Sequence, residues 1–285
     1  MLLSNTFMPF AAAIKRQAMR NSKNEKERNG CNMTVSNFYS VLKEMYPDSL
    51  SCPWDNDGLM VCRDPLAPVK KTAVALDATV SVIEKAAELG CDTLLVHHPM
   101  IFRKLSSLTA ESYIGRRVFA ALDSGISVIS LHTRLDAGAG GVNDCLCDTL
   151  GLTNVSAFGD AEAPEIGRIG DFEETEPENF ALHVKQALAA PFVEAYVCRA
   201  SRRIAVLGGG GGDFIVPAID AGADTIVVGE AGYNSAQDGA EAGINVIIAG
   251  HFYTENPVCR QLERLARTIA NSQVYVLNSN SGIAV

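Results

Sequence analysis

Short apolar runs alternate with helix-like patterns along most of this chain. Residues 93–96 and 204–207 are β-branched and apolar enough to predict short buried strands, whereas 80–87 and 113–122 place apolar residues at helical spacing. A glycine often stands between the end of a helical pattern and the next strand. This alternation indicates α/β layers with largely parallel central strands.

The pattern occurs twice. Residues 87–96 and 219–228 share a helix end, a glycine, an Asp-Thr pair and a buried strand, in that order. A second match joins 125–129 to 243–247, although the distance from glycine to the following histidine differs by one residue. The sequence therefore predicts two similar α/β modules with mixed sheets and imperfect internal symmetry.

Breaks in the pattern suggest where the modules begin and end. Glycines, prolines and an acidic run between Thr153 and Glu178 interrupt the periodic segments. An amphipathic helix from Pro257 to Ala270 and a strand from Gln273 to Leu277 are predicted to return to the first module. We expect a disordered extension or an early, incorrect start in 1–32, a first module in 33–155, a second in 156–250, and a returning segment in 251–285.

Most of the histidines fall in three short runs placed after apolar stretches: His97-His98, His132 with Asp136, and His251 with Glu255. Neighbouring side chains of a strand point to opposite faces, so His97 and His98 must lie beyond the strand's end to serve one site. A single histidine is more often a core or capping residue. Three runs together favour a metal site, because imidazole and carboxylate bind zinc, iron, manganese or nickel.

Several other residues have two readings. His132 is a candidate to orient a ligating carboxylate. Glu230 is a candidate general base, or else a capping or outer carboxylate. Asp55 and Asn56 are candidate turn formers. The glycine run 208–212 is either a phosphate cradle or, as we prefer, a sharp turn enforced by crowding.

Composition narrows the function classes. The formal net charge is -9 and the pI about 5.1, which disfavours general nucleic-acid binding. The 8 cysteines include no C-x-x-C pair, so we expect reduced thiols and a cytoplasmic protein. No apolar run approaches the roughly 20 residues that span a bilayer, so we expect no membrane segment.

Five motifs in this order resemble the NIF-three-like family, whose members are often labelled GTP cyclohydrolase 1 type 2 homologs. They are Trp54–Leu59, His97–Phe102, His132–Asp136, Gly141–Asp144 and Ala249–Glu255. The resemblance implies a NIF-three-like fold, in which two α/β modules face each other across a dimetal cleft. It also implies a ring-shaped hexamer. The implied ligands of the two divalent ions are His97, His98, Asp136, His251 and Glu255.

The chain also departs from the family pattern. Arg134 replaces the usual asparagine and is expected to add a cation beside the site, and 229–234 lacks histidines found there in some members. The implied ligand positions are all present.

Such a centre suits hydrolysis, since two bridged divalent ions activate water and polarise a carbonyl or phosphoryl oxygen. We therefore expect a dinuclear metal-dependent hydrolase-like protein acting on a small nucleotide-like, phosphorylated or cyclic amide substrate. A carboxylate, Asp136 or Glu255, is the expected bridging ligand. The alternative is a non-catalytic metal-binding scaffold or regulatory interaction protein.

Overall fold

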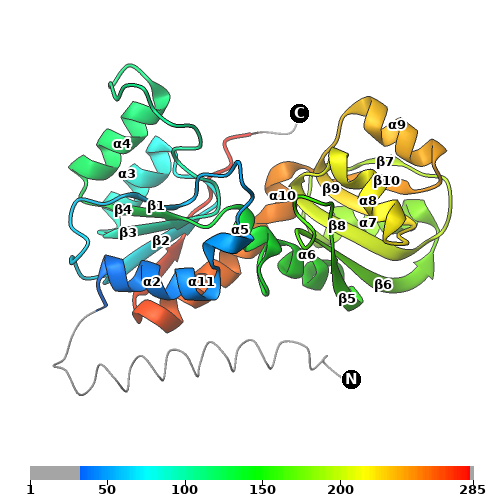
Figure 1. The fold of residues 1–285 in the computed structure, drawn as a ribbon, viewed down its shortest axis with the longest axis horizontal. Helices are drawn as coiled ribbons and strands as arrows, with labels where there is room; N and C mark the ends of the chain where they lie inside the picture. Colours follow the sequence, from blue (N-terminus) through cyan, green and yellow to red (C-terminus); the bar gives the residue numbers. More distant parts are fainter. Residues whose placement is uncertain (1–32, 283–285) are drawn as a thin grey trace. The chain divides into compact units, whose positions relative to one another are not determined.

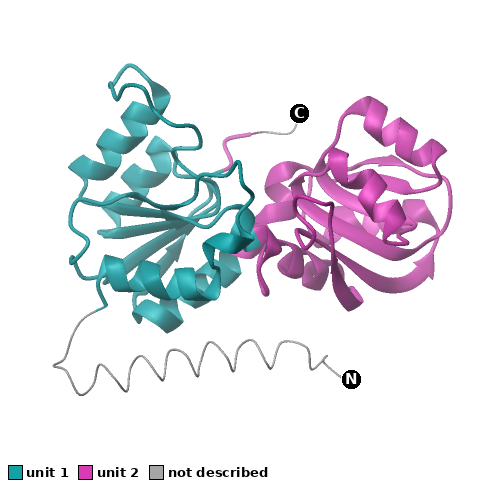
Figure 2. Ribbon diagram, viewed as in Figure 1, with its two compact units in different colours: residues 1–135, 259–279 teal, residues 136–258, 280–285 magenta. Residues whose placement is uncertain are grey.

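The computed structural model describes residues 33–282, so the predictions for 1–32 lie outside the described residues. The chain forms two compact units, coloured separately in Figure 2. Unit 1 comprises the described residues up to Leu135 together with Cys259–Ser279, and unit 2 comprises Asp136–Val258 with the residues from Asn280 on. The change of unit at Leu135 falls inside a helix, whereas the sequence placed the boundary between 155 and 156.

Unit 1 is built on a five-stranded sheet with the order β1-β4-β3-β2-β11 (Figure 1). The strands β4, β3, β2 and β11 are parallel, and β1 pairs antiparallel with β4. The strands are β1 (Gly58–Val61), β2 (Lys71–Ala75), β3 (Thr93–Val96), β4 (Ser127–Ser130) and β11 (Gln273–Val276). The helices are α2 (Val35–Met45), η1 (Asp48–Leu50), α3 (Val80–Glu88), α4 (Tyr113–Asp123) and α11 (Cys259–Ala270).

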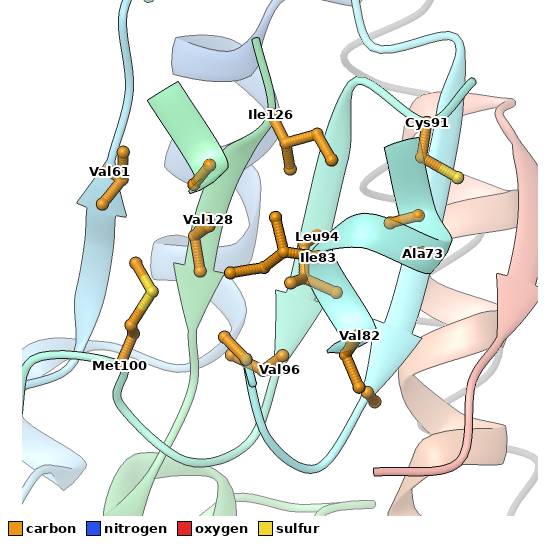
Figure 3. Packing of buried hydrophobic residues seen from close by; sticks show 14 of the residues in the cluster. Val61, Ala73, Val82, Ile83, Cys91, Leu94, Val96, Met100, Ile126 and Val128 are labelled. Atoms are coloured by element: carbon orange, nitrogen blue, oxygen red, sulfur yellow. The ribbon is translucent and has the colours of Figure 1, made fainter. Parts of the chain in front are cut away.

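Local sequence explains where several helices of unit 1 begin. The hydroxyl oxygens of Thr34, Thr79 and Ser112 each accept a hydrogen bond from a backbone N–H in the first turn, at α2, α3 and α4. Between α3, α4 and the sheet lies an apolar core that includes Ile83, Leu94 and Val128 (Figure 3). The packed strands hold the carboxyl ends of β2, β3 and β4 in fixed positions.

Unit 2 contains a six-stranded mixed sheet with the order β5-β6-β8-β9-β10-β7. The central strands β8, β9 and β10 are parallel, and the outer pairings are antiparallel. The strands are β5 (Thr153–Phe158), β6 (Gly167–Thr175), β7 (Glu194–Tyr196), β8 (Ser201–Gly210), β9 (Thr225–Glu230) and β10 (Asn245–Ile248). The helices are α6 (Val142–Leu150), α7 (Pro177–Ala187), η2 (Gly212–Phe214), α8 (Ile215–Asp220), α9 (Tyr233–Glu241), α10 (His251–Glu255) and η3 (Asn256–Val258).

The internal repeat is visible in the strand registers. Thr93 of β3 pairs with Ser127 of β4 in unit 1, and Thr225 of β9 pairs with Asn245 of β10 in unit 2. The two strands that follow a glycine in each half therefore have equivalent positions in their sheets. The preceding aspartates also match. Asp92 accepts from the backbone N–H groups of Lys70 and Lys71, and Asp224 accepts from those of Arg202 and Arg203.

The same registers explain why the copies are imperfect. Counting from the paired strands, His132 corresponds to Gly250, and His251 corresponds to Thr133. One residue of offset turns a helical side chain by about 100°. The two histidine-carboxylate runs are therefore not structural equivalents, although the strands that carry them are.

No helix within residues 33–282 has both the length and the apolar character needed to cross a membrane. The cysteines in this part of the chain are thiols rather than disulfides.

Candidate metal centre

Three histidines of unit 1 gather at one edge of its sheet. β3 ends at Val96, so His97 and His98 lie beyond the strand, as their adjacency predicts. His132 follows the neighbouring parallel strand β4 and directly precedes α5 (Thr133–Ala137). One ring nitrogen from each histidine lies within 4.8 Å of the others. These residues, which we call the first ligand group, meet where parallel strands collect functional side chains.

Each imidazole of the first ligand group is oriented through its Nδ1 atom. The acceptors are Leu131 O for His97 at 3.0 Å, Asp77 Oδ1 for His98 at 2.9 Å and Asp55 Oδ1 for His132 at 2.8 Å. A carbonyl or carboxylate oxygen only accepts, so Nδ1 donates and Nε2 becomes the basic nitrogen of the neutral ring. Metal-ligating histidines in proteins have this arrangement.

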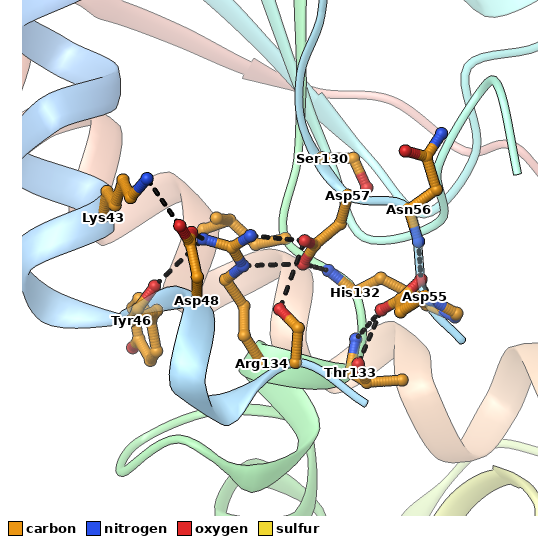
Figure 4. Close-up of polar contacts among 12 residues, drawn as sticks. Lys43, Tyr46, Asp48, Asp55, Asn56, Asp57, Ser130, His132, Thr133 and Arg134 are labelled. Carbon is orange, nitrogen blue, oxygen red and sulfur yellow. Dashed lines mark hydrogen bonds and ion pairs between the residues drawn. The ribbon is translucent and has the colours of Figure 1, made fainter. Parts of the chain in front are cut away.

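Asp55 anchors the start of α5 (Figure 4). Its Oδ2 accepts from the backbone N–H of Thr133 at 3.0 Å and from the Thr133 hydroxyl at 2.5 Å. Burial alone would raise the pKa of Asp55, but the interactions with His132 and Thr133 outweigh it and lower the pKa to about 2. Asp55 is thus held as a carboxylate against His132. It is this residue, and not Asp136, that accepts from the His132 Nδ1 atom.

Arg134 lies in a buried ion-pair network instead of adding a free cation beside the ligands, which corrects the sequence expectation (Figure 4). Its guanidinium forms a bidentate pair with Asp57, including an Nε–Oδ2 distance of 2.7 Å, and also bonds Asp48 at 2.9 Å. Arg134 is only 3% exposed. Burial alone would lower the pKa of Arg134, but Asp57, with Tyr39 and Asp48, outweighs that effect and raises the pKa.

Unit 2 carries a second ligand group, His251 and Glu255 in α10 with Glu230 at the end of β9. Glu255 follows His251 by four positions, which places both on one side of the short helix, with Nε2 and Oε2 3.1 Å apart. Oε2 of Glu230 lies 3.3 Å from the opposite nitrogen, Nδ1 of His251. Glu255 is buried and Glu230 is exposed. This contact agrees with the second interpretation of Glu230, in which its carboxylate contacts another residue of the site and does not act as a general base.

The glycine run 208–212 makes room for this group. A Cβ at Gly209 would overlap Oε1 of Glu255, and one at Gly208 would lie 3.1 Å from its Cγ. Contrary to the predicted sharp turn, β8 continues through Gly210, with a register shift after Leu207.

Backbone amides of the glycine run are already engaged by the protein. Gly208 N donates to Asn143 Oδ1 at 2.8 Å, and Gly209 N donates to Thr254 Oγ1 at 3.2 Å. These two bonds disfavour a phosphate cradle at this point, because the same N–H groups would have to face the anion.

Asp136 lies in α5, one helical turn after His132, and is 8% exposed. Its backbone carbonyl accepts from Nδ2 of Asn143 at 3.4 Å. Among the described residues, Asp136 belongs to neither of the side-chain clusters whose donor atoms are close enough together to hold a metal ion.

The donor chemistry fits a transition-metal site. The candidate metal-binding residues include His97 and His98 in unit 1 and His251 and Glu255 in unit 2. Oriented imidazoles and a buried carboxylate are the donors that zinc, iron, manganese and nickel accept. The sequence interpretation missed Asp77, although it follows a buried strand just as His97 and His98 do.

Comparisons with known proteins agree with the motifs. A model of the Duf34/NIF3 (NGG1p interacting factor 3) family matches residues 33–281. A Clostridium perfringens protein called GTP cyclohydrolase 1 type 2 homolog is 30% identical over 253 residues, which is 87% of this chain and 96% of the relative. A protein of the same description from Clostridium acetobutylicum is 33% identical over 233 residues, 79% of this chain and 86% of the relative.

Solved structures have the same fold. Staphylococcus aureus hypothetical protein SA1388 superposes with a TM-score of 0.82 at 26% identity, covering 89% of this chain and 100% of that one. Reduced HcgD from Methanocaldococcus jannaschii gives a TM-score of 0.75 at 26% identity, covering 86% and 98%. Fold and donor set together define a mixed α/β protein of two sheets with candidate metal ligands. The chain belongs to the Duf34/NIF3 family.

Proposed function

We propose that this chain is a dinuclear metal-dependent hydrolase-like protein that acts on a small nucleotide-like, phosphorylated or cyclic amide substrate. The observation that carries the proposal is the orientation of the first ligand group, in which every Nδ1 is fixed by an acceptor. An acceptor on Nδ1 is a feature of imidazoles that ligate through Nε2. The curated name shared by the relatives supports a nucleotide-like substrate.

The ligand groups of the two units complement each other chemically. The first offers three imidazoles, and its nearby carboxylates Asp55 and Asp77 are engaged on Nδ1. The second offers one imidazole and the buried carboxylate Glu255. A centre with two ions needs a carboxylate able to bridge them. We propose that His97, His98, Asp136, His251 and Glu255 are the ligands of two divalent ions.

The chain's own residues have defined tasks in this proposal. When bound, the two ions would supply Lewis acidity and would lower the pKa of water. Leu131 O, Asp77 and Asp55 accept hydrogen bonds from Nδ1 of the three imidazoles, so Nε2 is the nitrogen of each ring that would ligate. Glu230 orients His251 through Nδ1, as an outer carboxylate does. The general-base role, in which Glu230 would accept a proton from water, remains the second assignment that we propose for this residue.

Turnover assays test the catalytic part of the proposal. Purified protein is loaded separately with zinc, manganese, iron or nickel and offered GTP, bis(p-nitrophenyl) phosphate and dihydrouracil. We expect metal-dependent hydrolysis of at least one compound, lost in His98→Ala and in Glu255→Ala. His183→Ala is the matched control, because His183 of α7 bonds the carbonyl oxygen of Leu150 at the end of α6 and belongs to neither ligand group.

Metal binding without turnover in any loaded form would instead favour the scaffold alternative. That alternative has its own support in the family description, which refers to interaction with NGG1p. We also propose a cytoplasmic homo-oligomer, a hexamer by family resemblance. Thiol cysteines support the compartment. A light-scattering mass equal to that of a single chain would exclude the oligomer.

A further inference from the structure

Two large aromatic side chains lie exposed beside the first ligand group. Trp54 is 57% exposed and Phe102 is 42% exposed. Their ring centroids are 6.1 Å apart in an edge-to-face arrangement. The His132 ring lies 6.3 Å from Trp54 and 6.0 Å from Phe102. Both aromatic rings therefore border the same candidate ligand and present apolar surface to solvent.

Neither ring belongs to the apolar core of unit 1. That core includes Met100 and is lined by Ile101, but Trp54 and Phe102 are not among its members. Aromatic side chains stabilise a fold mainly when their surface is removed from water. More than half of Trp54 remains in water, so packing gives an incomplete account of its position.

The loop that carries Trp54 is held on both sides of this residue. Cys52 N donates to Thr133 Oγ1 at 2.9 Å, and Asp55 accepts from the Thr133 N–H and hydroxyl. Asn56 then reaches across to the carbonyl oxygen of Ile101, the residue before Phe102. These bonds tie the two loops to each other and to the start of α5, where Figure 4 shows the contact between Asp55 and Thr133.

A platform held in this way loses little conformational entropy when a ligand stacks on it. Planar heterocycles match an aromatic surface in both shape and electrostatics, since their π-faces stack on tryptophan and phenylalanine. Aliphatic or purely ionic ligands gain less from such a surface. The nearness of His132 means that a stacked ring would lie next to the proposed metal ligands.

We propose that Trp54 and Phe102 form a stacking platform that holds a planar nitrogen heterocycle of the substrate beside His132. The platform deepens the proposed function, on which it rests, by assigning the residues that select the substrate's ring. In this proposal Trp54 and Phe102 bind the substrate, and the proposed metal ligands stay the same.

Trp54 is the single tryptophan of the chain, so tryptophan emission, excited selectively over that of tyrosine, reports on this site alone. The metal-loaded protein is titrated with GMP, AMP and UMP, and with ribose 5-phosphate as a probe that lacks the ring. We expect saturable quenching by at least one nucleotide and none by ribose 5-phosphate. Absence of saturable quenching by all three nucleotides, or equal quenching by ribose 5-phosphate, would overturn the platform.

Calorimetry with the quenching nucleotide tests the two side chains directly. Trp54→Leu and Phe102→Leu should each weaken binding by about 5- to 150-fold, the range for loss of one stacking partner. Trp54→Phe should retain most of the affinity. Phe192→Leu is the control, because Phe192 is also an exposed aromatic residue, 64% exposed, but lies in unit 2. Unchanged affinity in both leucine variants would refute the proposal.

The result separates this proposal from the proposed function. Both leucine variants should keep wild-type metal content. Normal metal content and turnover with unaltered nucleotide affinity in the variants would remove only the platform. Specific quenching in a protein that shows no turnover would remove only the hydrolase. Trp54 emission that shifts with protein concentration, and not with nucleotide, would assign the surface to a second copy of the chain and overturn the platform.

Discussion

Gly209 and Glu255 share one small space in unit 2, because a Cβ at Gly209 would overlap Oε1 of Glu255 and lie 3.2 Å from Nε2 of His251. Gly209 also has a φ of +71°, in the left-handed region that favours glycine. The end of β8 therefore has glycines, which lack side chains, at the point where α10 brings together the carboxylate of Glu255 and the imidazole of His251. This relationship makes the glycine run part of the candidate ligand architecture.

Gly209→Ala should disturb both folding and metal binding. We expect a loss of about 1 to 2 kcal/mol in the free energy of unfolding from the left-handed backbone, and at least about tenfold weaker metal affinity from displacement of Glu255. Chelator-competition titration measures the affinity. Gly222→Ala is a matched control, since Gly222 has a φ of +85° and open space around its Cβ position. Equal metal affinity in the two variants would contradict the prediction.

Asp77→Asn should weaken metal binding without changing a proposed ligand. The carboxylate fixes Nδ1 of His98 at 2.9 Å, and loss of such an outer partner lowers metal affinity by about 10- to 100-fold. Ser279 donates to the other oxygen of Asp77, Oδ2, at 2.9 Å. Ser279→Ala therefore alters the same carboxylate from its far side and should change the affinity little. If the serine variant had the larger effect, His98 would not be the route by which Asp77 acts.

Arg134→Met should destabilise unit 1. It leaves Asp57, whose side chain is 2% exposed, as a buried carboxylate without its cation, and breaking such a pair costs about 3 to 5 kcal/mol. Urea denaturation measures the change. The double variant Arg134→Met with Asp57→Asn should lose less than the sum of the single variants, since no charge is then left buried. Strict additivity would show that the ion pair is not coupled.

Asn143→Ala should destabilise unit 2. The fully buried amide accepts from Gly208 N and donates to Ile166 O at 2.7 Å and to Asp136 O at 3.4 Å, so its removal takes a hydrogen-bond partner from three backbone groups. Each orphaned group costs about 1 to 3 kcal/mol in the free energy of unfolding. Thr149→Ala removes only a side-chain bond within the same helix, to Cys145 O, and should cost less. Equal destabilisation of the two variants would argue against the bridging role of Asn143.

The sequence predicted those features that depend on local pattern. β3 spans Thr93–Val96 as the apolar run indicated, and His97 and His98 lie beyond its end because adjacent strand residues face opposite ways. The repeat also gave the correct relation between strands, since Thr93 and Thr225 have matching registers. The parallel central strands of both units also follow from the alternation of strand and helix.

Features that depend on long-range packing were not predictable in the same way. Asp77 meets His98 only because β2 and β3 are neighbours in the sheet, which the order of strands in the sequence does not state. Arg134 follows the ligand run closely in sequence, yet its side chain bonds Asp48 and Asp57. The change of unit at Leu135 falls within α5, where no glycine, proline or shift in composition marks it.

Elemental analysis of the purified protein tests the central claim most directly. If His97, His98, Asp136, His251 and Glu255 are the ligands of two divalent ions, the wild-type chain should bind about two such ions. His97→Ala in unit 1 and Glu255→Ala in unit 2 should each lower that content, while His183→Ala should leave it unchanged. Wild-type metal content in both His97→Ala and Glu255→Ala, with each variant correctly folded by circular dichroism, would contradict the account.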